Sequence, residues 1–146
     1  MAGVDRCPGE AGVEVAPKDS FLASLERCQR VGNFLLRFYA RFTDSSEEIR
    51  HRFRLTDFRR QMRMLGESLR LCALAIRGDR QGLVELNERA LTHDRHHHNA
   101  KPEWYQLWLD ALVETAAQTD PLWSEELEAT WRRELGYVIH HMQSRY

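Results

Sequence analysis

Apolar residues recur at spacings of three and four along most of this chain, the spacing that places side chains on one face of an α-helix. Alternation of apolar and polar residues, which marks a half-buried β-strand, is nowhere sustained, and the hairpin dipeptides Asn-Gly and Asp-Gly are absent. The pattern therefore predicts an all-α protein of six or seven helices with short connections. The expected helices cover about residues 20–28, 32–42, 47–51, 56–76, 79–93, 102–113 and 121–142.

Residues that favour helix ends mark several of these segments. Asp19 or Ser20 is expected to cap the first helix, and Thr56 to open the long one. Pro102 stands at the first position of its helix, where a missing N–H costs nothing. Asp120, followed by proline, repeats the cap-and-proline pattern for the last helix. The core stripe of that helix is Leu127, Trp131, Leu135, Val138 and Met142.

The composition is that of one globular domain. The chain has 146 residues, 42% hydrophobic and 29% charged, which suits a single core and is unlike disordered or membrane-spanning chains. A formal net charge of −1 gives no basis for a nucleic-acid or anionic-membrane partner. No apolar run has the length of a transmembrane helix or of a signal peptide, so we expect a cytoplasmic protein with no membrane partner.

The N-terminal segment differs from the rest of the chain. Residues 1–17 hold three glycines and two prolines without periodicity, and we expect a flexible tail there, followed by one domain over residues 18–146. Three widely spaced cysteines make neither a zinc pattern nor a disulfide framework. They are expected to be free thiols: Cys7, Cys28 and Cys72.

His93 is the candidate residue with the largest chemical consequence. It ends an amphipathic segment, so its imidazole is expected beside an apolar pocket, an arrangement that suits an iron porphyrin. His96 and His97 follow closely and are alternatives for the same role. The three histidines also have a helical spacing that suits zinc or copper, and this alternative stays open.

Several motifs occur in the order, and near the spacing, that is found in one protein family. They are Phe38-Tyr39, Phe53, the segment 56–65, His93 and the segment 102–105. Over about residues 20–146 the sequence resembles the globin family, and it looks closest to bacterial single-domain globins and to the globin domain of flavohaemoglobins. The resemblance implies an all-α, globin-like fold of six to eight helices around a pocket for one haem b (iron protoporphyrin IX).

The resemblance also implies residues on the distal side of that haem. Tyr39 matches a tyrosine whose hydroxyl donates to a bound gas, and Gln61 matches the distal position on the long helix, a second donor. Leu65 matches the apolar residue that limits the size of the pocket. Phe53 matches the phenylalanine that wedges against the porphyrin.

On the proximal side, the resemblance makes His93 the ligand of the haem iron and Tyr105 a tyrosine that orients this histidine. Arginines crowd the start of the long helix, and one or two of them are expected to pair with haem propionates, the others with solvent. They are Arg50, Arg52, Arg54, Arg59, Arg60 and Arg63. Nucleic-acid binding by these arginines is a weak alternative, since the whole chain is close to neutral.

The resemblance implies a protein that binds oxygen, nitric oxide or carbon monoxide reversibly. With an external reductase it would act in nitric oxide detoxification as a dioxygenase, or as a weak peroxidase. Two alternatives belong to other classes: a haem-based gas or redox sensor that acts through a separate partner, and a haem-free globin-like interaction module. A monomer or a homodimer is expected, the latter through the tryptophan-rich helix that begins near Trp104.

Overall fold

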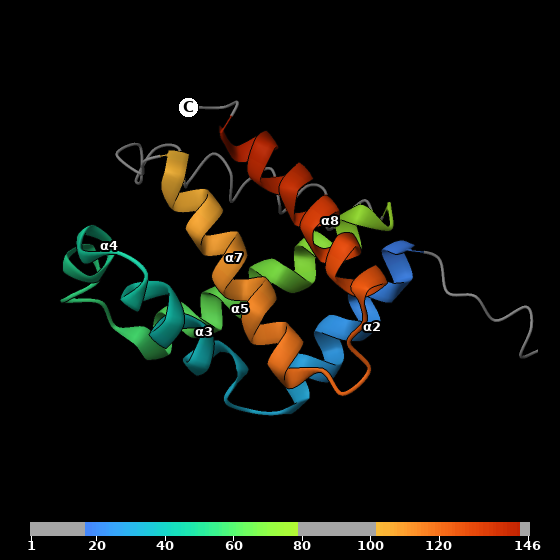
Figure 1. Cartoon of the computed structure of the whole chain (residues 1–146), viewed down its shortest axis with the longest axis horizontal. Coiled ribbons are helices and arrows are strands. Elements are labelled where there is room, and N and C mark those ends of the chain that lie inside the picture. The colour runs from blue at the N-terminus through green and yellow to red at the C-terminus, as the bar shows by residue number, and fades with distance from the viewer. Residues whose placement is uncertain (1–16, 79–101, 144–146) are drawn as a thin grey trace, which may run out of the picture.

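The computed structural model describes residues 17–78 and 102–143, and the described residues form helices joined by turns (Figure 1). The all-α prediction is confirmed. The predicted helix that ends at His93 and residues 1–16 of the predicted tail lie outside the described residues. The described helices are α2 (Pro17–Arg30), α3 (Phe34–Asp44), α4 (Glu47–Arg52), α5 (Phe58–Ile76), α7 (Pro102–Thr119) and α8 (Glu125–Gln143).

Helices α7 and α8 form an antiparallel pair, orange and red in Figure 1. Helix α2 packs against α8 and α5, and α3 packs along α7, while the short α4 joins α3 to the start of α5. In the view of Figure 1, α5 passes behind α7. This arrangement brings α3, α4 and the first turns of α5 together at one end of the molecule. Among the described helices, none is long and apolar enough to cross a membrane.

The core is centred on Trp131 of α8, which is 0% exposed. Phe21 of α2 and Phe34 of α3 meet its ring edge-on, with ring centroids at 5.0 and 6.5 Å. Such edge-to-face pairs add to the free energy gained from burying the rings. The predicted core stripe is confirmed for Trp131, Leu127 and Leu135, while the side chains of the other two residues lie outside the described part.

A buried polar cluster ties α2 to the turn between α7 and α8. The carboxylate of Asp120, 0% exposed, accepts hydrogen bonds from Arg27 at 2.7 and 2.9 Å and from the Ser24 hydroxyl at 2.6 Å. The indole N–H of Trp131 donates to Ser24 Oγ at 3.0 Å. Burial alone would raise the pKa of Asp120, but hydrogen bonds from Arg27, Ser24 and the Leu122 N–H hold this pKa below its ordinary value.

Three predicted helix starts differ from the structure. Helix α2 begins at Pro17, three residues before the expected start. Helix α5 is capped by Asp57 rather than Thr56, because the Asp57 carboxylate accepts the Arg60 N–H at 3.3 Å. The final helix is capped by Ser124, whose Oγ accepts the Leu127 N–H at 3.1 Å. Asp120 is not a cap because its carboxylate is already held by the buried cluster. The predicted start of α7 at Pro102 is confirmed.

Candidate functional site

Tyr39 of α3 lies at the centre of an aromatic cluster where α3, α4 and α5 meet. Its side chain is 4% exposed, and its ring lies 6.2 Å from that of Phe53 and 5.5 Å from that of Phe58. Phe53 ends α4 and Phe58 begins α5, so the turn between these helices brings both rings against α3. Phe53 and Phe58 are themselves stacked, with centroids 6.1 Å apart.

The side chain of Gln61 lies near the Tyr39 hydroxyl and acts on the pKa of that hydroxyl as a hydrogen-bonding group. Gln61 is the fourth residue of α5 and follows Phe58 by three positions, so the two side chains lie on neighbouring parts of one helix face. Burial raises the pKa of Tyr39 to about 12, against the lowering effect of its hydrogen bond to Gln61. The Tyr39 hydroxyl therefore keeps its proton, and remains a hydrogen-bond donor, throughout the physiological pH range.

Leu65 follows Gln61 by one helical turn and is half-buried against the core. The i, i+4 spacing places the two side chains on the same face of α5. Four residues predicted on one side of the pocket are thus brought to one end of the molecule by α3, α4 and α5. They are Tyr39, Phe53, Gln61 and Leu65.

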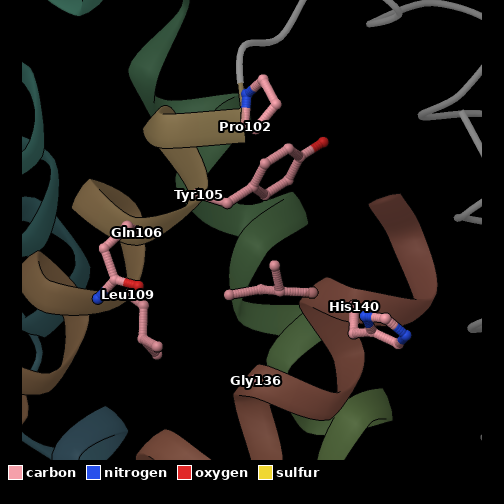
Figure 2. Close-up of a pocket in the computed structure, with 7 residues that line it drawn as sticks. Pro102, Tyr105, Gln106, Leu109, Gly136 and His140 are labelled. Carbon is pink, nitrogen blue, oxygen red and sulfur yellow. The ribbon is translucent and has the colours of Figure 1, made fainter. Parts of the chain in front are cut away.

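Tyr105 lies apart from these four, near the start of α7, and is buried. It lines a cavity of about 210 Å³ between the first turns of α7 and the last turns of α8 (Figure 2). Gly136 of α8 borders open space here, because a Cβ added to it would meet no atom within 4 Å. The residues that line the cavity are Pro102, Tyr105, Gln106, Leu109, Gly136, Ile139 and His140.

His93 lies outside the described residues, as do His96 and His97, so the choice of iron ligand stays a prediction. The proposed zinc or copper site formed by these histidines is untested for the same reason. Within residues 17–78 and 102–143, no group of three or more His, Cys, Asp or Glu side chains is arranged to hold a metal ion.

The chain is similar to a solved protein of Pseudomonas aeruginosa PAO1 that is described as structurally highly homologous to a human hemoglobin. The two sequences are 31% identical, and the match covers 90% of this chain and 98% of that one, with a TM-score of 0.80. The chain belongs to the globin family. No protein-family model matches this globin, and neither does any curated protein. The likeness to the Pseudomonas aeruginosa protein confirms the predicted globin-like fold.

Two contacts of this globin's site escaped the sequence reasoning. Phe58 lies in the motif segment 56–65 without a predicted role, and its ring joins the cluster around Tyr39. The sequence feature that could have indicated this contact is the position of Phe58 three residues before Gln61. The guanidinium of Arg52 lies over the ring of Trp104, 5.2 Å from its centroid, and so links α4 to α7. No spacing rule connects two residues so far apart in the chain.

The arginines near the start of α5 have different surroundings in the globin. Arg50 pairs with Asp44 at 2.7 Å and with Glu47 at 3.1 Å. Arg54 donates to the His51 carbonyl oxygen at 2.8 Å. For Arg59, Arg60 and Arg63, no ion pair is formed with another described residue. Their side chains are exposed, in agreement with the prediction that most of the group is solvated.

Proposed function

We propose that this globin holds one haem b between α5 and the segment that contains His93, and that it binds oxygen, nitric oxide or carbon monoxide there. The observation that carries the proposal is the buried Tyr39 hydroxyl beside the Gln61 side chain, within the aromatic cluster of Phe53 and Phe58. Buried hydroxyl and amide groups lose free energy unless they are hydrogen-bonded. Two such groups, placed together within an apolar surface, suit a small polar ligand that arrives between the helices.

The residues of the pocket fit a haem in their chemistry. Phe53 and Phe58 offer flat apolar surfaces of the kind that pack against a porphyrin, and Leu65 continues this surface along α5. Bound haem would supply the iron atom that coordinates the gas. The neutral imidazole of His93 would hold the iron, and Tyr105 of α7 is the residue that we propose to orient this imidazole.

The distal pair would act on the gas by donating hydrogen bonds. The Tyr39 hydroxyl is the stronger candidate, since it is buried and keeps its proton, and the Gln61 amide can donate beside it. A donor held in place in a site with little water stabilises partial negative charge more than water does. Oxygen gains more from this than carbon monoxide, because it takes on more negative charge when it is coordinated.

The same polar pair supports nitric oxide dioxygenation as a second activity, since it would retain oxygen long enough to meet nitric oxide. That activity needs an external reductase, as does weak peroxidase activity. From the sequence motifs we also propose that this globin is most like the globin domain of flavohaemoglobins. A gas or redox sensor would use the same pocket and differ in its partner, whereas a haem-free interaction module would leave the pocket without a cofactor.

Replacing Tyr39 by phenylalanine tests the distal hydrogen bond with the ring kept in place. Oxygen dissociation from the haem-loaded variant is expected to be about 10- to 100-fold faster, since hydrogen bonds that involve charge are worth about 1.5–3 kcal/mol. Carbon monoxide dissociation should change much less. Stopped-flow absorbance measures both rates.

The matched control is Tyr137→Phe, which removes the same hydroxyl from a tyrosine of α8 that is 72% exposed. This variant should release both gases at the wild-type rate. Equal oxygen dissociation from Tyr39→Phe and the wild type would contradict the proposed role of the hydroxyl.

A further inference from the structure

Positive charge is concentrated on one short stretch of this near-neutral chain. Residues 50–63 contain six arginines and one aspartate, a formal charge of +5, whereas the whole chain carries −1 and the remainder therefore −6. Five exposed residues of this stretch, on the 53–57 turn and the first turns of α5, are named here the arginine surface. They are Arg54, Leu55, Arg59, Arg60 and Arg63.

The arginines on α5 form no ion pair that would hold the described part of the fold together. Arg59 and Arg60 stand in the first turn, where the partial positive charge of the helix N-terminus disfavours a cation, and that turn has no acidic residue. Neither they nor Arg63 forms an ion pair with any described residue. Arg50, by contrast, is held by two carboxylates. Apart from the capping carboxylate of Asp57, no described acidic residue offsets this unfavourable arrangement, which indicates a use outside the fold.

Leu55 indicates which kind of anion the arginine surface fits. Its side chain is 87% exposed at the tip of the turn between α4 and α5, beside Arg54. A small anion or a phosphate backbone gains nothing from an exposed leucine, whereas protein interfaces combine an apolar centre with arginines. The partner with matching chemistry is therefore a protein with an acidic surface around an apolar spot.

The arginine surface adjoins the aromatic cluster that would line the proposed haem pocket. The turn that carries Arg54 and Leu55 also joins Phe53 to Phe58, and both rings pack against Tyr39. A protein docked on this turn would thus be separated from the pocket by one layer of aromatic side chains. Short separations of this kind are needed for electron transfer between two proteins.

We propose that the arginine surface docks an acidic one-electron carrier protein. This inference rests on the proposed function, because the electron is passed to a haem in the adjacent pocket. The reduced carrier loses one electron and ferric iron gains it, with no bond made or broken. The long-range charge attraction speeds the encounter, and Leu55 supplies the apolar contact of the docked complex.

The test measures binding of a reduced, acidic [2Fe–2S] ferredoxin to the full chain by titration calorimetry, with and without haem. The double variant Arg59→Gln/Arg60→Gln is expected to bind at least about tenfold more weakly than the wild type. The control Arg70→Gln/Arg133→Gln removes the same charge from exposed residues elsewhere and should bind within about twofold. Wild-type affinity should fall steeply when salt is raised to about 0.2 M.

Thermal unfolding of the same variants separates docking from folding. Loss of Arg59 and Arg60 should leave the unfolding midpoint unchanged or raise it, since both charges oppose the helix dipole. A lower midpoint overturns the proposal, because the arginines would then serve the fold. A variant that binds the ferredoxin normally but releases haem faster also overturns it, because the arginines would then hold the propionates.

Further results would contradict the proposal directly. The first is failure of the wild-type chain to bind the ferredoxin, and the second is equal binding of the ferredoxin by the double variant and the wild type. The third is that the wild-type chain binds phosphatidylserine vesicles or duplex DNA more tightly than it binds the ferredoxin. Binding is measured on the haem-free chain as well. A chain that binds ferredoxin but takes up no haem would therefore defeat the proposed function without removing the docking surface.

Discussion

Asp120→Ala is expected to lower the free energy of unfolding by about 3–5 kcal/mol, the usual effect of removing one partner from a buried ion pair. The substitution leaves the Arg27 guanidinium without its carboxylate and deprives the Ser24 hydroxyl of its acceptor. It also removes the acceptor of the Leu122 N–H in the turn before α8. Because the cluster joins α2 to the α7–α8 turn, the whole helical assembly should lose stability together.

Urea unfolding followed by circular dichroism measures this loss. The matched control is Asp110→Ala, which breaks the half-exposed pair of Asp110 with Arg132 and should cost no more than about 1 kcal/mol. Each substitution removes the aspartate of an ion pair with an arginine, and the two aspartates differ in how deeply they are buried. Similar losses for both variants would show that burial of Asp120 does not have the effect described.

The ion pair of Asp120 with Arg27 also predicts how the free energy of unfolding depends on pH. Since the folded protein holds the pKa of Asp120 below its ordinary value, the unfolded chain binds the proton more readily. The stabilisation is therefore complete above the ordinary aspartate pKa of about 4 and is lost as the pH falls further. Asp120→Asn should show a shallower fall in this acid range than the wild type, and an equal fall would contradict the assignment.

His93→Ala is expected to remove most of the affinity for haem and to change the visible spectrum of what remains. Loss of residues that merely support a metal ligand costs about 10–100-fold in affinity, and loss of the ligand itself should cost more. Haem transfer to an acceptor protein, followed by absorbance, gives the rate of loss. Tyr39 is not expected to take over the role of the histidine, because its raised pKa disfavours the phenolate that would bind iron.

The control for this substitution is His140→Ala, since His140 is an exposed histidine of α8 beside the cavity at Tyr105. Its removal should leave haem affinity and spectrum unchanged. A His93→Ala protein that keeps the wild-type ferrous spectrum would transfer the ligand role to His96 or His97, which the sequence left as alternatives.

Local features of the sequence predicted most of the described helices. Periodicity placed α3 and α8, and a proline at a first helical position placed the start of α7. The caps were predicted less well because a capping residue is recognised by type alone. Asp120 has the right type and is followed by proline, but its carboxylate is taken by Arg27, a residue 93 positions away. Ser124, with no such partner, caps the helix.

The candidate site was predicted in part for similar reasons. The family pattern named Tyr39 and Gln61 together, and the fold brings their side chains close to each other. The packing of Phe58 against Tyr39 depends on how the α4–α5 turn directs two helices, which a pattern along one helix does not report. The arrangement of Arg52 over Trp104 depends on α4 and α7, which are distant in the sequence.

Haem uptake by the purified wild-type chain is the most direct test of the account. Titration of the haem-free protein with haem is expected to give a sharp Soret band that saturates at one haem per chain. After reduction, the band should shift reversibly on addition of oxygen or carbon monoxide. A protein that stays colourless after gel filtration, or that binds haem without saturation and without a shift, would contradict the haem pocket proposed around Tyr39 and Gln61.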